Sequence, residues 1–278
     1  MTDINEAAQI INEAFHQAAL EAALLESHHE VEFLKKCTDL ARDQFNEKNT
    51  NKNIRIKTGY IHQKPYAIFI DPKDIAEKSR TELGDLLIVV KRKKANLIER
   101  EATFIQVKWD SSKPPPYPSW KIEPHQRDFW KNIKTNKFSF GKKARKAGGY
   151  DDIVFDGIKE DGNLCRYLFV NPYFLNKQSA WLIDLDLIKD KDKYETKDFL
   201  LNFQSMFENK LKDILNGAGV KVKNKLPEVP GVGGSLSDIL TIIYKYLGWQ
   251  EDPPEEFESY FEGDEGFMVL EITVLDKE

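Results

Sequence analysis

Apolar residues recur at helical spacing along the first part of the chain, from about Asn5 to Phe45. A helix with one buried face shows this repeat of three to four residues. The polar stretch ESHHE at 26–30 interrupts the apolar face and offers a point at which the helix divides. The N-terminal segment is therefore predicted to be helical, as one long helix or as two shorter ones.

After the Asn-rich stretch at 46–53 the pattern becomes that of β-strands. Two β-rich runs in 54–70 predict two strands, and 71–82 is predicted to be a loop or short turn. The segment at 83–94 is nearly continuously apolar before its basic end, which predicts a central position in a sheet. It is predicted to pair antiparallel with the next run, ATFIQVKW at 102–109.

The second half of the chain mixes both patterns. Four prolines prevent the preceding strand from continuing beyond Asp110, and 110–120 is predicted to be a rigid surface connection. The elements predicted after it are a short helix at 123–133, a hairpin made of 151–158 and 166–175 around the turn sequence KEDGN, an amphipathic helix over 197–219 that stops at Gly217, a helix over 236–249 capped by Ser235 or Ser237, and a strand at 266–275.

These elements predict an α/β (α+β) protein with a mixed central sheet flanked by helices. Residues 1–172 are expected to form the main domain. Residues 173–278 are expected to be a C-terminal extension of helices and a strand, either separate or part of the same domain.

Composition and charge limit the partners. The chain has 278 residues, 41% of them hydrophobic and 12% aromatic, which is enough for a sizeable core. Its formal net charge of -5 gives no general basic field. A nucleic-acid partner would therefore have to be bound by a local basic patch.

The cysteines and the apolar segments suggest where the protein acts. Cys37 and Cys165 form neither a disulfide framework nor a zinc motif, and both are expected to be buried in the core. The N-terminal sequence lacks the pattern of a secretory signal, and no apolar stretch is long enough to span a bilayer. We expect a cytoplasmic protein without membrane contact.

Two polar residues stand on one face of the strand at 102–109. Because successive strand side chains alternate between faces, Gln106 and Lys108 are neighbours. An edge strand with its polar face in water would explain them. However, Asp85 begins the neighbouring buried strand, where a carboxylate is costly unless it has a partner or a function.

Asp85 on one strand and Q-x-K on the next, with helices before and after, resemble the PD-(D/E)xK superfamily of restriction-endonuclease-like nucleases. The resemblance covers about residues 30–135. Gln106 stands where an acid is usual, which is similar to the Mrr-type branch of restriction enzymes. No proline precedes Asp85. The resemblance implies a restriction-endonuclease-like mixed sheet and a metal-dependent nuclease.

The resemblance also implies roles for these residues. Phosphodiester hydrolysis needs a hard cation, Mg²⁺ or Mn²⁺, and oxygen atoms are its natural ligands. Asp85, the amide of Gln106 and the carbonyl of Val107 would bind the cation. Lys108 would orient the attacking water or stabilise negative charge on the phosphate. The alternative is that Lys108 has no catalytic role and is a structural residue.

Further acids and one amide could complete such a site. Glu30 is the candidate metal ligand from the preceding helix, with Glu32 as the second choice. Glu82 would restore the charge that Gln106 lacks if Gly84 bends the chain. Gln126, in the helix that follows, is expected beside the site as a catalytic residue. Its alternative is a solvated position on the helix surface.

A basic segment with aromatic residues follows that helix. Its cations are suited to a phosphate backbone, with Phe138, Phe140 and Tyr150 between them, although a solvated loop would look the same. The predicted nucleic-acid-binding residues are Lys137, Lys142, Lys143, Arg145 and Lys146.

Two classes of function remain open. The first is a metal-dependent DNA endonuclease. By analogy it is expected to act in defence against foreign DNA, alone, with another protein subunit of a defence system or as an oligomer. The second is a catalytically inactive subunit of the same fold that binds nucleic acid or assembles a complex. The sequence does not separate DNA from RNA as the substrate.

Overall fold

The structure is a computed structural model of the whole chain. It describes residues 2–24, 30–48, 53–62, 66–70, 78–94, 97–110, 112–113, 118–140, 153–173, 180–189, 191, 193–195, 206–222, 226–227, 234–247, 249 and 266–275.

A seven-stranded mixed sheet forms the centre of the molecule. Its strand order is β1-β13-β4-β5-β9-β10, with β12 paired to β5. The strands are β1 (Ile54–His62), β4 (Leu86–Lys94), β5 (Leu97–Trp109), β9 (Cys165–Val170), β10 (Ala180–Asp184), β12 (Val220–Val222) and β13 (Gly266–Leu275). The pairs β13/β4 and β5/β9 are parallel and the others are antiparallel. The predicted mixed central sheet flanked by helices is confirmed.

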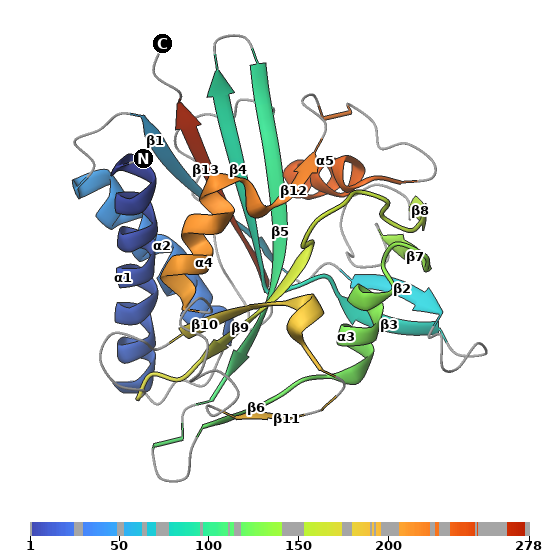
Figure 1. The fold of residues 1–278 in the computed structure, drawn as a ribbon, viewed down its shortest axis with the longest axis horizontal. Coiled ribbons are helices and arrows are strands. Elements are labelled where there is room, and N and C mark those ends of the chain that lie inside the picture. Colours follow the sequence, from blue (N-terminus) through green and yellow to red (C-terminus); the bar gives the residue numbers. More distant parts are fainter. Residues whose placement is uncertain are drawn as a thin grey trace.

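Helices cover both faces of this sheet (Figure 1). One face packs against α1, α2 and α4, and the other against α3, α5 and a second small sheet. The helices are α1 (Thr2–Leu24), α2 (Glu30–Lys48), α3 (Pro124–Lys131), α4 (Phe207–Asp213) and α5 (Leu236–Tyr246). The sheet thus separates the hydrophobic cluster beneath α1, α2 and α4 from two clusters on its other face. The second of these contains Tyr167 and Phe169 of β9 and Trp181 of β10.

The C-terminal strand lies inside the sheet. β13 pairs with β1 on one side and with β4 on the other. Residues 1–172 and 173–278 therefore both contribute strands to the central sheet.

The second sheet corrects one prediction. It has the order β3-β2-β7-β8. Its strands are β2 (Tyr66–Ile70), β3 (Lys78–Glu82), β7 (Lys137–Phe140) and β8 (Ile153–Asp156). The expectation of a loop or short turn over all of 71–82 is wrong for β3, because backbone pairing with β2 forms a strand from the polar sequence KSRTE.

The predicted hairpin of 151–158 and 166–175 is also wrong. β8 pairs with β7 in the small sheet, whereas β9 pairs with β5 and β10 in the central one. The sequence between them leads from one sheet to the other. Short β6 (Ser119–Lys121) and β11 (Lys193–Glu195) form a separate pair.

The helices follow the sequence pattern more closely. The N-terminal helical segment is two helices, and Ser235 caps α5, where Asp238 Oδ2 accepts a hydrogen bond from the Ser235 backbone N–H at 2.7 Å. α4 starts only at Phe207, after the extended residue Met206, and continues as a π-helical turn, η5 (Ile214–Ala218). Gly217 has a φ of 113°, a conformation that favours glycine, and it ends the helix as predicted.

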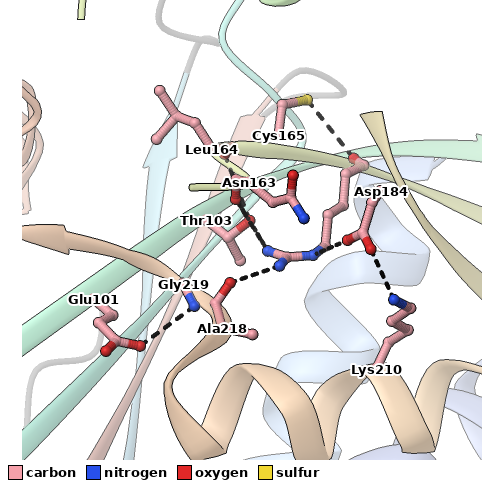
Figure 2. Close-up of polar contacts among 10 residues, drawn as sticks. Glu101, Thr103, Asn163, Leu164, Cys165, Asp184, Lys210, Ala218 and Gly219 are labelled. Atoms are coloured by element: carbon pink, nitrogen blue, oxygen red, sulfur yellow. Dashed lines mark hydrogen bonds and ion pairs between the residues drawn. The ribbon is translucent and has the colours of Figure 1, made fainter. Parts of the chain in front are cut away.

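A buried arginine joins the sheet to the end of that helix (Figure 2). Arg166 of β9 donates from Nε to Asp184 Oδ1 at 2.7 Å, from Nη1 to Thr103 Oγ1 at 2.6 Å and from Nη2 to the Ala218 carbonyl at 2.7 Å. Lys210 of α4 donates to the other oxygen of Asp184 at 2.7 Å. This Arg166 cluster lies on the sheet face covered by α1, α2 and α4, because Arg166 is in register with Ile105 of that core.

Candidate functional site

The predicted Asp strand and Q-x-K strand are adjacent and antiparallel. β4 pairs with β5 from Leu86↔Ile105 onward, and Asp85 is the residue just before this ladder. The Asp85 N–H donates to the Ile105 carbonyl at 3.0 Å. Gly84 permits this approach, since a Cβ there would lie 3.1 Å from the same carbonyl oxygen. The two strands thus place Asp85 beside the end of β5.

The Asp85 side chain reaches over β5. Its Oδ2 accepts a hydrogen bond from the Val107 N–H at 2.7 Å, and the residue is 2% exposed. The N–H and C=O of one strand residue point to the same side. The Val107 carbonyl is therefore directed to the side on which Asp85 lies.

Gln106 is the most unusual polar group of the site. It is fully buried, and its Nε2 donates to the Glu82 carbonyl at a long 3.4 Å. Its Oε1 is buried without a hydrogen-bond partner in the described part of the chain. Buried polar atoms are nearly always bonded, so this amide oxygen is a candidate ligand atom.

Lys108 and Gln126 meet as the sequence predicted. Lys108 Nζ donates to Gln126 Oε1 at 3.3 Å, from the end of β5 to the first turn of α3. Lys108 is half-buried and Gln126 is 7% exposed. The solvated alternative for Gln126 does not fit this burial.

Helix α3 buries two further polar side chains besides Gln126. Arg127 and Asp128 are also buried, and Arg127 Nε lies 3.3 Å from Asp128 Oδ1. Arg127 Nη1 donates to the Lys191 carbonyl at 3.3 Å. Three consecutive buried polar side chains need partners. Phe129 and Trp130 of the same helix are buried in the apolar core, so α3 covers this part of the sheet with both polar and apolar side chains.

Sequence reasoning missed Tyr167. It is the register partner of Gln106 on β9, it is fully buried, and its hydroxyl has no hydrogen-bond partner among the described residues. Its run, CRYLFV, is otherwise almost entirely apolar, so the sequence pattern indicated only a buried strand. Only the pairing of β5 with β9 brings it to the site.

Cys165 shows that this face of the sheet is dry. Burial raises the pKa of the Cys165 thiol well above its ordinary value. Cys37 is likewise fully buried, with a raised pKa from burial. Both cysteines are core residues, as predicted.

The candidate acids from other elements are not brought together by the described structure. The side chains of Glu30 and Glu32, at the start of α2, lie outside the described residues. Glu82 contributes its backbone carbonyl to Gln106. No group of three or more His, Cys, Asp or Glu side chains among the described residues is placed to bind a metal. A cation here would depend on one carboxylate and neutral oxygens.

The basic segment is only partly described. Lys137 lies on β7 with its Nζ 3.1 Å from Asp156 Oδ1, and both side chains are exposed. Lys142, Lys143, Arg145, Lys146 and Tyr150 lie outside the described residues. The predicted role of Phe138 and Phe140 at a phosphate backbone is wrong, because both rings are buried in the core.

Comparisons with models of known protein families, with curated proteins and with solved structures found no match. No helix in the described ranges is long and apolar enough to cross a membrane. Any function therefore has to rest on the chemistry of the site itself.

Proposed function

We propose that the protein is a metal-dependent nuclease of the restriction-endonuclease-like type, with its site at Asp85, Gln106 and Lys108. The supporting observation is the buried Oε1 of Gln106, which has no hydrogen-bond partner among the described residues. The same strand carries half-buried Lys108, and its Val107 N–H donates to the buried Asp85 carboxylate. An oxygen without a partner in a dry site is a cost to the fold unless a ligand binds it.

The oxygen atoms present suit a hard cation. The Asp85 carboxylate, the Gln106 amide oxygen and the Val107 carbonyl would hold Mg²⁺ or Mn²⁺. When bound, the cation polarises a phosphoryl oxygen and lowers the pKa of a coordinated water.

Lys108 would supply a second positive charge, from the protein itself. Lys108 presents its ammonium at the end of β5, and Gln126 holds it there through Oε1. A fixed positive charge at this point stabilises the negative charge that develops on a phosphate during hydrolysis. Lys108 is therefore the catalytic lysine of the proposal.

The substrate and setting belong to the same proposal. DNA is the proposed substrate, gripped in part by the basic segment 137–146. Cleavage of foreign DNA in the cytoplasm, alone or with another protein subunit, is the proposed role.

The test is cleavage of supercoiled plasmid and linear duplex with Mg²⁺, Mn²⁺ or EDTA. Lys108→Met keeps the length of the side chain and removes its charge, so the rate should fall about 100-fold or more. Lys121→Met is the matched control, because Lys121 is an exposed lysine on β6 whose Nζ lies 3.2 Å from Glu123 Oε1 at the surface. Thermal unfolding of both variants would show that the fold is intact.

Cleavage retained by Lys108→Met would contradict the assignment of the site. Parallel lanes with single-stranded and duplex RNA decide the substrate. If RNA were cut in preference to DNA, the proposed metal-dependent hydrolysis would stand, but the substrate would be RNA.

A second candidate is a catalytically inactive subunit of the same fold. The hydrogen bond from the Val107 N–H to Asp85 favours it, because this bond gives the carboxylate a structural use at the β4/β5 junction. In that case Mg²⁺ and Mn²⁺ would leave the melting temperature unchanged and all lanes would be uncut. DNA binding would persist and would weaken when the basic segment is neutralised.

A further inference from the structure

Tyr167 brings a second unpartnered polar atom to the proposed site. Its side chain lies on the same sheet face as Gln106, because the two residues are in register on parallel strands. Its ring packs near Phe169, with centroids 6.1 Å apart and planes at 21°. Gln106 Oε1 and the Tyr167 hydroxyl have no hydrogen-bond partner among the described residues, so they are not bonded to each other.

The hydroxyl of Tyr167 is a donor at neutral pH. Burial raises the pKa of this phenol well above its ordinary value. A phenylalanine would fill the same volume without burying a hydroxyl. The hydroxyl therefore adds a cost to the fold that the packing of the ring does not require.

The two atoms are chemically complementary. The Tyr167 hydroxyl can donate, and the Gln106 amide oxygen can accept through two lone pairs. A water molecule that accepts from the phenol and donates to the amide would satisfy both. The second lone pair of the amide oxygen would remain available for a cation.

We propose that Tyr167 is a positioning residue of the metal site, which holds the Gln106 amide oxygen toward the cation through a shared water molecule. This inference rests on the proposed function, since it gives Tyr167 a role at the same site. Groups that orient a metal ligand in this way commonly change metal affinity by about 10–100-fold when removed.

The experiment uses Mn²⁺ alone as the probe, with binding followed by the electron paramagnetic resonance signal of the free ion. Tyr167→Phe removes only the hydroxyl. We expect its Mn²⁺ affinity to fall about tenfold, while the melting temperature of the metal-free protein stays unchanged or rises.

Tyr194→Phe is the matched control. Tyr194 belongs to the same buried cluster as Tyr167, and its ring centroid lies 5.6 Å from that of Phe169. Its hydroxyl, however, accepts a hydrogen bond from the Lys189 N–H. Its loss should lower the melting temperature and leave Mn²⁺ affinity unchanged, the opposite of the result expected for Tyr167→Phe.

Three results would overturn the proposal, and they are distinguishable. Wild-type affinity in Tyr167→Phe, together with lost binding in Asp85→Asn, removes the role of Tyr167 and leaves the metal site intact. A lower melting temperature of metal-free Tyr167→Phe with unchanged affinity makes the hydroxyl structural. Absence of Mn²⁺ binding by the wild-type protein overturns both this inference and the proposed function.

Discussion

Strands β5 and β9 carry two clusters of buried polar side chains on opposite faces, the Arg166 cluster and the proposed site, and the two clusters are bonded differently. In the Arg166 cluster every guanidinium nitrogen donates, to Asp184, Thr103 and Ala218, and Lys210 occupies the second oxygen of Asp184 (Figure 2). On the opposite face, Gln106 Oε1 and the Tyr167 hydroxyl have no partner among the described residues.

The difference separates stability from function. A fully bonded buried network stabilises one arrangement of the chain, whereas a partly bonded one weakens the fold unless a ligand completes it. The Arg166 cluster joins β9, β5, β10 and the end of α4. We therefore assign a structural role to the Arg166 cluster and the proposed chemistry to the polar residues on the opposite face, beneath α3.

The largest expected effect is on the structural face. Arg166→Met would leave the Thr103 hydroxyl and the Ala218 carbonyl without their donor and Asp184 with only Lys210. Removing one member of a buried charged network costs about 3–5 kcal/mol of unfolding free energy.

Urea unfolding at neutral pH measures this loss, with Lys121→Met as the exposed control, for which about 0–1 kcal/mol is expected. Equal losses in the two variants would mean that the Arg166 cluster is solvated, and the contrast between the faces would fail.

A pair of variants on β5 sharpens the comparison, because Thr103 and Gln106 lie three residues apart on opposite faces. Thr103→Val removes the shorter of the two acceptor contacts of Arg166 Nη1, whose other acceptor is the Asn163 carbonyl, with little change in shape. It should lower the unfolding free energy by about 1–3 kcal/mol. Gln106→Met removes an amide whose oxygen has no partner, and should leave the unfolding free energy unchanged or raise it.

The same urea unfolding experiments test whether the unfolding free energy falls in Thr103→Val and stays unchanged or rises in Gln106→Met. If Gln106→Met destabilised the metal-free protein as much as Thr103→Val, the amide would be a structural group. Its proposed place in the metal site would then lose its main support.

The sequence predicted the parts of the site that lie on continuous patterns. The apolar run after Asp85, the alternation around Gln106 and Lys108, and the short helix with Gln126 each carry a local periodicity that a single chain segment reveals. The confirmed pairing of β4 with β5 follows from their closeness in the chain.

The predictions that were wrong concern strands whose structure depends on pairing with other segments of the chain. β3 has a polar sequence that only β2 makes into a strand, and β9 pairs in parallel with β5 across about 60 residues instead of forming a hairpin. Tyr167 could not be found without that pairing. Arg166 did carry a signal, a cation inside an apolar run, which is rare unless it is paired.

The smallest expected effect is on the pH dependence of stability. Burial alone would raise the pKa of Asp184, but the hydrogen bond from Lys210 and the charge of Arg166 outweigh it and hold this pKa below its usual range. A carboxylate with a lowered pKa in the folded state stabilises the fold above its unfolded pKa of about 3.9. This contribution is lost as the pH falls through the folded pKa. Unfolding free energy should therefore fall less steeply with acid in Asp184→Asn than in the wild type.

Asp161 supplies the matched control. Its pKa is also lowered, by the hydrogen bond and charge of Lys134, but its side chain is almost fully exposed. Salt screens exposed charges far more than buried ones, so about 1 M NaCl should abolish the acid effect of Asp161→Asn and leave most of that of Asp184→Asn. An Asp184 effect that disappears in salt would mean that its ion pairs are hydrated in solution. The Arg166 cluster would then owe its stability to packing, and hydrogen bonding would no longer distinguish it from the proposed site.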